Sequence, residues 1–162
     1  MPNPMGDTIQ GSTIRHSVTV ELPIEEAFAR FVDDLGQWWP PEYTWSQDVL
    51  EEIRLKPREG GMCFERGPHG FRCDWGRVVA FEPAARIAFT WQIGPSREPV
   101  PDERRASVVE VSFESEGETS TRVTLEHRGF ERHGEAGDAY RDALASERGW
   151  PYILGRYTAV TG

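Results

Sequence analysis

The sequence predicts an α+β fold in which a curved antiparallel sheet of about seven strands wraps a long C-terminal helix. Alternating apolar and polar residues recur in short segments between residues 13 and 128, which is the period-two pattern of half-buried strands. Beyond Gly137 the apolar residues recur at the roughly 3.6-residue period of a helix. With 162 residues, of which 38% are hydrophobic, the chain fits one domain with a single core.

Charge and hydropathy narrow the classes of partner. The formal net charge of −9 makes binding to nucleic acid or to an anionic membrane surface unfavourable. No apolar run approaches the roughly 20 residues that a bilayer span needs, and residues 1–11 lack the apolar stretch of a signal peptide. We therefore expect a cytoplasmic protein with no membrane span.

The N-terminal part predicts a tail, a strand and a short helix. Residues 1–11 contain two prolines and two glycines without periodicity, so we expect a flexible tail ahead of a single domain over residues 12–162. A strand is expected at residues 13–22, where apolar and polar residues tend to alternate. A helix should follow, because Pro23 favours a first turn and apolar residues recur at helical spacing up to Gly36, its expected end.

Two irregular segments separate the remaining elements. The first is an aromatic connector, residues 37–45, in which Pro40 and Pro41 prevent a regular helix. The second is a flap, residues 94–105, which carries three prolines and six charged residues and is too polar to belong to the core. Six alternating segments predict the strands of a meander, at residues 49–56, 61–66, 73–81, 86–92, 106–115 and 120–128.

The C-terminal helical pattern contains a break. Tyr140 and Leu144 share one helical face, and a second apolar helical stretch begins at Trp150. Gly149 and Pro151 interrupt the two stretches, so we expect either a kinked helix or a short helix followed by a longer one.

The order of these elements resembles the helix-grip fold of the SRPBCC superfamily, which includes START-like and birch-pollen-allergen-like domains. Three stretches resemble the branch named after the activator of a heat-shock-protein ATPase. They are GRVVAFEP followed by RIAFTW within residues 76–91, TRVTLEHRGF at residues 121–130, and the pair Gly149-Trp150 at the entry to the last helix. The resemblance extends from about residue 12 to the C-terminus.

This resemblance implies a fold and leaves several functions open. We expect binding or carriage of a small apolar or aromatic molecule in a cavity between the sheet and the C-terminal helix. One alternative is a cyclase-, dehydratase- or hydrolase-like enzyme that uses the same cavity. The other is an interaction module that modulates a chaperone ATPase, although the eukaryotic co-chaperone of this branch has an additional domain for which this chain has no room. A monomer and a homodimer are equally consistent with the sequence.

The alternating strands predict the walls of the cavity. Every second side chain of a strand lies on the same face of the sheet. The apolar residues that alternate along the segments at 86–92 and 106–115 should therefore point inward. The predicted ligand contacts from these strands are Phe89, Trp91, Val109, Val111 and Phe113.

His127 is the polar residue of most interest, because the alternation along the segment at 120–128 places it inward, at the end of its strand. An imidazole there can anchor a ligand oxygen or act as a general base near neutral pH, which makes His127 a weak catalytic candidate. The alternative, a core histidine hydrogen-bonded to a neighbouring element, is favoured.

Large aromatic residues supply the remaining predicted contacts. In the aromatic connector, Trp38 and Trp39, together with Tyr43 and Trp45, either form a lid over the cavity or plug the end of the core. From the terminal helix the predicted contacts are Trp150, Leu154 and Tyr157, for which core packing is the alternative.

Other chemistry finds little support in the sequence. The four histidines and two cysteines lack metal-ligand spacing, and no nucleotide-binding motif is present, so we predict no metal and no cofactor. A disulfide between Cys63 and Cys73 across a hairpin is conceivable, but two reduced thiols are favoured in a cytosolic domain. Four charged residues lie on neighbouring predicted strands: Arg54, Glu65, Asp74 and Arg77. A carboxylate–guanidinium pair inside the cavity is one alternative for them, and the solvated outer face is favoured.

Overall fold

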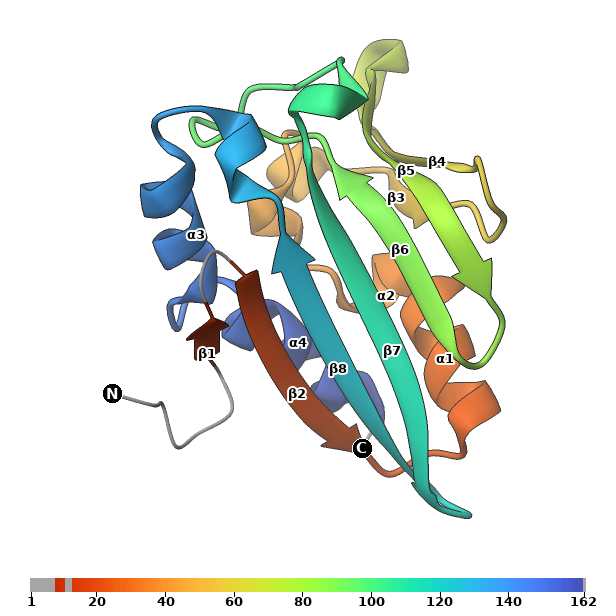
Figure 1. Cartoon of the computed structure of the whole chain (residues 1–162). Helices are drawn as coiled ribbons and strands as arrows, with labels where there is room; N and C mark the ends of the chain where they lie inside the picture. The colour runs from red at the N-terminus through yellow and green to blue at the C-terminus, as the bar shows by residue number, and fades with distance from the viewer. Residues whose placement is uncertain (1–7, 11–12, 162) are drawn as a thin grey trace.

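The computed structural model describes residues 8–10 and 13–161. Its strands form one antiparallel sheet in the order β1-β2-β8-β7-β6-β5-β4-β3, and the sheet curls along its length (Figure 1). The strands are β1 (Thr8–Gln10), β2 (Thr13–Val20), β3 (Glu52–Leu55), β4 (Met62–Arg66), β5 (Arg72–Glu82), β6 (Arg86–Trp91), β7 (Ser107–Gly117) and β8 (Ser120–Arg128).

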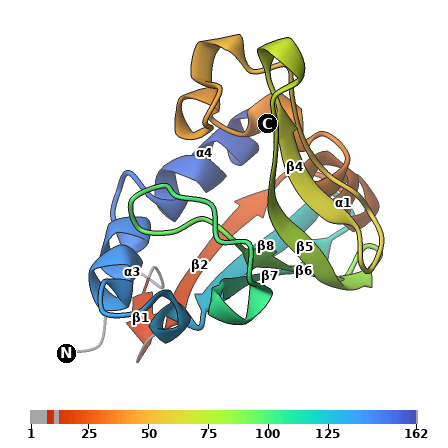
Figure 2. The same cartoon turned by 90° about the horizontal axis from the view of Figure 1, so that it is seen from above.

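Helices occupy the concave face of the sheet, with the C-terminal helix held inside the curl (Figures 1 and 2). They are α1 (Ile24–Val32), α2 (Leu35–Trp38), α3 (Gly137–Ala145) and α4 (Trp150–Thr161). This arrangement confirms the predicted α+β helix-grip fold. No helix in the described part of the chain is long and apolar enough to cross a membrane.

Alternation along the strands separates the core from the solvated face. In β7, Val109 and Val111 are fully buried. Glu110, between them, lies on the outer face and forms ion pairs with Arg86 on β6 at 3.3 Å and with Arg128 on β8 at 3.0 Å. The side chains of β7 therefore alternate between the core and the outer face as predicted.

The predicted tail lies largely outside the described residues, apart from residues 8–10. These three residues form β1, which pairs antiparallel with the start of β2. Three residues are too few to display an alternating pattern, so the sequence did not indicate this edge strand. Within the described residues the sheet consequently has eight strands, where about seven were predicted.

The predicted end of the first helix at Gly36 is wrong. Helix α1 ends at Val32, and Gly36 lies inside the four-residue helix α2. A Cβ atom at Gly36 would lie 3.1 Å from the carbonyl oxygen of Ile53 in β3. The glycine therefore permits close packing of α2 against the sheet instead of terminating a helix.

The break near the C-terminus takes the form of a nine-residue helix, α3, followed by a twelve-residue helix, α4. Pro151 falls in the first turn of α4, where its missing N–H costs little. Gly149 makes the turn between the helices possible, because a Cβ atom there would overlap the carbonyl group of Leu144. The sequence therefore located the interruption correctly.

Candidate functional site

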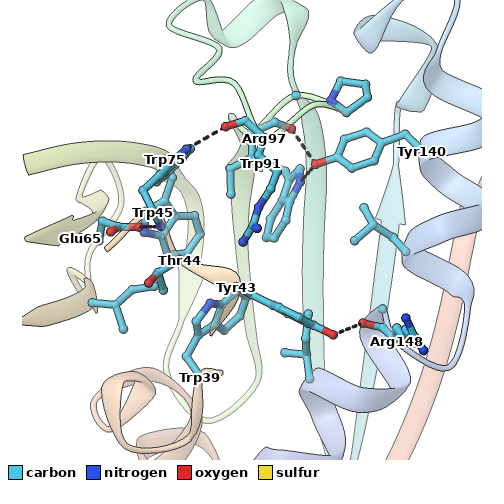
Figure 3. Close-up of a pocket in the computed structure, with 17 residues that line it drawn as sticks. Trp39, Tyr43, Thr44, Trp45, Glu65, Trp75, Trp91, Arg97, Tyr140 and Arg148 are labelled. Atoms are coloured by element: carbon cyan, nitrogen blue, oxygen red, sulfur yellow. Dashed lines mark hydrogen bonds between the residues drawn. The ribbon is translucent and has the colours of Figure 1, made fainter. Parts of the chain in front are cut away.

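A pocket of about 260 Å³ opens at the end of the sheet, where the aromatic connector, the flap and the α3–α4 junction meet (Figure 3). Viewed from above, the flap lies between α3 and the hairpin of β4 and β5 (Figure 2). Strands β5 and β6 supply the deeper wall of the pocket. Six aromatic side chains line it: Trp39, Tyr43, Trp45, Trp75, Trp91 and Tyr140.

Three tryptophans form the floor of the pocket. Trp39 follows α2, Trp75 lies in β5, and Trp91 ends β6. The rings of Trp39 and Trp75 stack with centroids 5.8 Å apart, and the Trp91 ring lies 6.2 Å and 6.0 Å from them. Because these rings support one another within favourable contact distances, the floor is preformed.

Trp75 belongs to this floor because of a β-bulge. Residues 63 and 64 of β4 pair with Gly76 and Asp74 of β5, which leaves Trp75 as the extra residue between them. Gly76 is needed at this point, since a Cβ atom there would overlap the carbonyl oxygen of Thr90. Bulges redirect side chains and are common beside binding sites.

Hydrogen bonds from aromatic side chains to loop carbonyls hold the rim of the pocket. The Tyr43 hydroxyl donates to the carbonyl of Arg148 at 2.8 Å, which joins the aromatic connector to the α3–α4 junction. The Trp45 indole N–H donates to the carbonyl of Arg97 at 2.7 Å, which joins the aromatic connector to the flap. Arg97 has a φ of 64°, an uncommon backbone conformation for a residue other than glycine.

Tyr140 brings a hydroxyl into the pocket from α3 (Figure 3). This oxygen accepts a hydrogen bond from Trp91 Nε1 at 2.7 Å and donates one to the carbonyl of Ile93 at 2.8 Å. Burial raises the pKa of the Tyr140 hydroxyl, so it keeps its proton at neutral pH. The group is therefore a neutral phenol with a fixed orientation.

Glu65 on β4 is fully buried, which corrects the expectation that it faces solvent. Its two carboxylate oxygens accept the backbone N–H groups of Trp45 at 3.1 Å and Ser46 at 3.0 Å. Buried carboxylates need such partners, and here the partners come from the end of the aromatic connector. Glu65 therefore fixes Trp45 at the rim.

His127 lies behind the pocket in the interior, with an exposed fraction of 0%. Trp150 Nε1 donates to its Nδ1 at 3.0 Å, so the ring proton is on Nε2, 2.7 Å from Ser107 Oγ. Ser107 Oγ lies 2.7 Å from His133 Nε2, to which it donates. Burial, and to a lesser degree the charge of His133, lower the pKa of His127 well below its usual range. This is the arrangement expected of a neutral core histidine.

Of the predicted ligand contacts, Trp39 and Trp91 line the pocket, as do Tyr43 and Trp45, which were predicted to form a lid over the cavity or to plug the core. Two other predicted contacts use their polar groups inside the fold. Trp38 Nε1 donates to the Arg30 carbonyl, and the Tyr157 hydroxyl donates to the Ala27 carbonyl. The predicted contacts that are buried in the core and do not line this pocket are Trp38, Phe89, Val109, Val111, Phe113, His127, Trp150, Leu154 and Tyr157.

Sequence reasoning did not assign Trp75, Glu65 or Tyr140 to the pocket. For Trp75 a signal existed, because the glycine that follows it inside an alternating segment indicates a bulge. The hydrogen-bond partners of Glu65 lie about 20 positions away in the chain, and those of Tyr140 lie 47 and 49 positions away. A local sequence pattern does not predict such contacts.

The cysteines form neither a disulfide nor part of a metal site. Cys63 pairs across the hairpin with Gly76 and Cys73 with Glu65, so the two thiols lie on different rungs and are free. Burial raises the pKa of Cys63, and burial with the nearby carboxylates raises that of Cys73 to about 11, which keeps both protonated at neutral pH. Among the described residues, no group of three or more His, Cys, Asp or Glu side chains is arranged to hold a metal ion.

Fold and pocket together define the class, a helix-grip domain with an aromatic-lined pocket at its open end. The chain belongs to the family described as Activator of Hsp90 ATPase homolog 1-like protein, whose match spans residues 21–161. The resemblance read from the sequence motifs is thereby confirmed. No curated protein matches the chain.

Solved structures extend the comparison over nearly the whole chain. One is an anthrahydroquino-γ-pyrone synthase, Txn09, complexed with SUM; it is 32% identical, the match covers 99% of each chain, and the TM-score is 0.65. Another is CalC, a self-sacrificing resistance protein from Micromonospora echinospora, at 24% identity, 92% and 93% coverage and a TM-score of 0.61. Protein NE0264 from Nitrosomonas europaea shares 15% identity, 94% and 96% coverage and a TM-score of 0.65. At these last two identities the likeness shows the fold alone.

Proposed function

We propose that this protein binds a flat aromatic or apolar small molecule in the pocket at the open end of the sheet. The observation that carries the proposal is the convergence of six aromatic side chains from several segments around one opening. Ligand sites are typically concave and apolar, with a few polar groups that orient the bound molecule. The cytoplasmic location remains a prediction from composition.

The size and lining of the pocket favour a molecule of a few fused rings. Its volume of about 260 Å³ is close to the lower end of the roughly 300–1,000 Å³ of drug-sized sites. Ile93, Leu144 and Ile153 add aliphatic surface beside the aromatic rings. Charged groups, Arg97 and Arg148, are exposed at the rim, where they favour an acidic substituent that remains in solvent.

Binding of a soluble tricyclic probe tests this proposal. Titration with anthraquinone-2-sulfonate, followed by calorimetry and tryptophan fluorescence, should show saturable binding at one site. A Leu144→Trp variant, which fills the pocket from α3, should weaken binding about tenfold or more. Leu22→Trp is the matched control, because Leu22 is partly buried and does not line the pocket. Equal affinity in the parent and the Leu144→Trp variant would contradict the proposal.

A second candidate function is catalysis of ring closure on such a molecule. It is favoured by the 32% identity to the anthrahydroquino-γ-pyrone synthase over 99% of each chain. Within the pocket the Tyr140 hydroxyl is placed to donate a hydrogen bond to a reacting carbonyl, whereas His127 does not line the cavity. Forming a pyrone ring joins an oxygen to a carbon, so isomerisation of 2′-hydroxychalcone to flavanone is a suitable assay. No acceleration over buffer, with this probe bound, would count against this candidate.

The chaperone-related alternative rests on the family description only. It predicts that the protein changes the ATPase rate of Hsp90 at saturating concentration, which a coupled ATPase assay measures. An unchanged rate would dispose of this alternative.

A further inference from the structure

The polar groups of the pocket are mostly hydrogen-bond donors. The Tyr140 hydroxyl, the Tyr43 hydroxyl and the guanidinium groups of Arg97 and Arg148 all line it. The indole nitrogen of Trp75 is buried and has no hydrogen-bond partner among the described residues. Such an orphaned donor is uncommon in a folded protein, and Trp75 itself lines the pocket.

The acceptors of the pocket are already occupied. Both carboxylate oxygens of Glu65 receive backbone N–H groups. The Thr44 hydroxyl receives the N–H of Gln47 at 2.9 Å and donates to the Pro41 carbonyl at 2.7 Å. The hydroxyl protons of Tyr43 and Tyr140 are likewise used, on the carbonyls of Arg148 and Ile93, so a ligand that brings an oxygen acceptor must replace one of these carbonyls.

Among the donors, the Tyr140 hydroxyl has the best defined position. Its oxygen accepts the Trp91 indole N–H at 2.7 Å, which fixes the direction of its own O–H bond. A donor that itself receives a hydrogen bond is polarised and donates more strongly. In this structure the Tyr140 hydroxyl donates to the Ile93 carbonyl at 2.8 Å, and Ile93 immediately precedes the flap in the chain.

The Ile93 carbonyl is an acceptor that a ligand can replace. Residue 93 pairs only through an isolated bridge with Pro99, outside the named strands. Ile93 is only partly buried and lines the pocket. A ligand acceptor in the pocket therefore competes with this carbonyl for the Tyr140 hydroxyl.

We propose that Tyr140 anchors the ligand by donating its hydroxyl hydrogen bond to a carbonyl oxygen of the ligand, in place of the Ile93 carbonyl. The preferred ligands are then planar aromatic ketones and quinones, and the corresponding hydrocarbons bind more weakly. This assignment rests on the proposed function, because it names the substrate class of the same pocket.

A matched pair of probes tests the assignment. Anthraquinone-2-sulfonate and anthracene-2-sulfonate share the ring system and the sulfonate and differ in the two carbonyl groups. The parent should bind the quinone more tightly, and Tyr140→Phe should reduce quinone affinity about fivefold, the worth of one neutral hydrogen bond, with little change for the anthracene. Tyr152→Phe is the matched control, since Tyr152 loses a hydroxyl bond to Glu42 outside the pocket.

A spectroscopic readout on the parent protein makes the test independent of the variant's folding. The carbonyl stretching band of the bound quinone should move to lower frequency relative to the same quinone in an apolar solvent. Equal affinities of the parent for both probes, or an equal loss of both in Tyr140→Phe, would overturn the role of Tyr140 while leaving aromatic binding intact. Failure of the parent to bind either probe would instead contradict the proposed function itself.

Discussion

The interior of this protein has a closed half and an open half, and the two use hydrogen bonds differently. In the closed half, around His127, Ser107 and Trp150, side chains of strands and helices bond to one another. In the open half, which is the pocket, the side chains of Tyr43 and Trp45 bond to backbone carbonyls of irregular segments. The space that a ligand can enter therefore lies where the strands and helices end. The alternating sequence pattern of the strands predicts the closed half better than the open half.

The largest expected effect is in the closed half. Trp150 has an exposed fraction of 0% and contacts the rings of Trp91 and Trp39. Trp150→Ala should lower the free energy of unfolding by about 3–5 kcal/mol, the usual cost of deleting a large buried ring. Urea unfolding followed by circular dichroism measures this loss. A loss below 1 kcal/mol would contradict the close packing of Trp150 in the closed half.

Replacing the histidine tests whether the closed half serves stability alone. His127→Leu leaves Trp150 Nε1 and Ser107 Oγ without their buried partner, which should cost about 2 kcal/mol of unfolding free energy. Affinity for anthraquinone-2-sulfonate should stay unchanged, as His127 does not line the pocket. A large loss of affinity with full stability would restore His127 as a ligand contact.

Acid should weaken the closed half selectively. Because the pKa of His127 is lowered in the folded state, the unfolded chain binds the extra proton first as the pH falls below about 6.5. The stability due to the neutral ring is therefore complete above that pH and is lost below it, by at most about 1.4 kcal/mol per pH unit. Urea unfolding at pH 7.5, 6.5 and 5.5 measures the slope. The His127→Leu variant should show a shallower slope, and identical slopes would refute the assignment.

The smallest expected effect is at the rim of the open half. Trp45→Phe keeps an aromatic ring but removes the bond to the Arg97 carbonyl, which is exposed to solvent. We expect a stability loss of only about 0.5 kcal/mol, together with faster amide hydrogen exchange in the flap. Exchange detected by mass spectrometry on flap peptides provides the measurement. Unchanged exchange would show that this bond does not restrain the flap.

The same contrast explains how much the sequence predicts. Alternation along the strands placed Val109, Val111 and His127 inward, and Gly149 with Pro151 located the break between the last two helices. These features depend on residues close together in the chain, so a local pattern is sufficient to find them.

The pocket depends on contacts that a local pattern does not contain. Trp75 joins the floor of the pocket through a bulge. Glu65 points inward because its two carboxyl oxygens accept the backbone N–H groups of Trp45 and Ser46. Tyr140 shares a predicted helical face with Leu144, but its partners, Trp91 and Ile93, become visible only in three dimensions. The sequence therefore indicated a cavity and four of its aromatic residues, Trp39, Tyr43, Trp45 and Trp91, without the carboxyl group of Glu65 or the hydroxyl of Tyr140.

The tight turn at Gly149 also bears on ligand size. Gly149, Leu144 and Arg148 all lie on the wall of the pocket, and the contact of Gly149 with the Leu144 carbonyl leaves no room for a methyl group. Any larger residue must push the end of α3 away from the start of α4. The aperture of the pocket is thus set by a position that offers a ligand no functional group, and engineering for bulkier molecules should begin there.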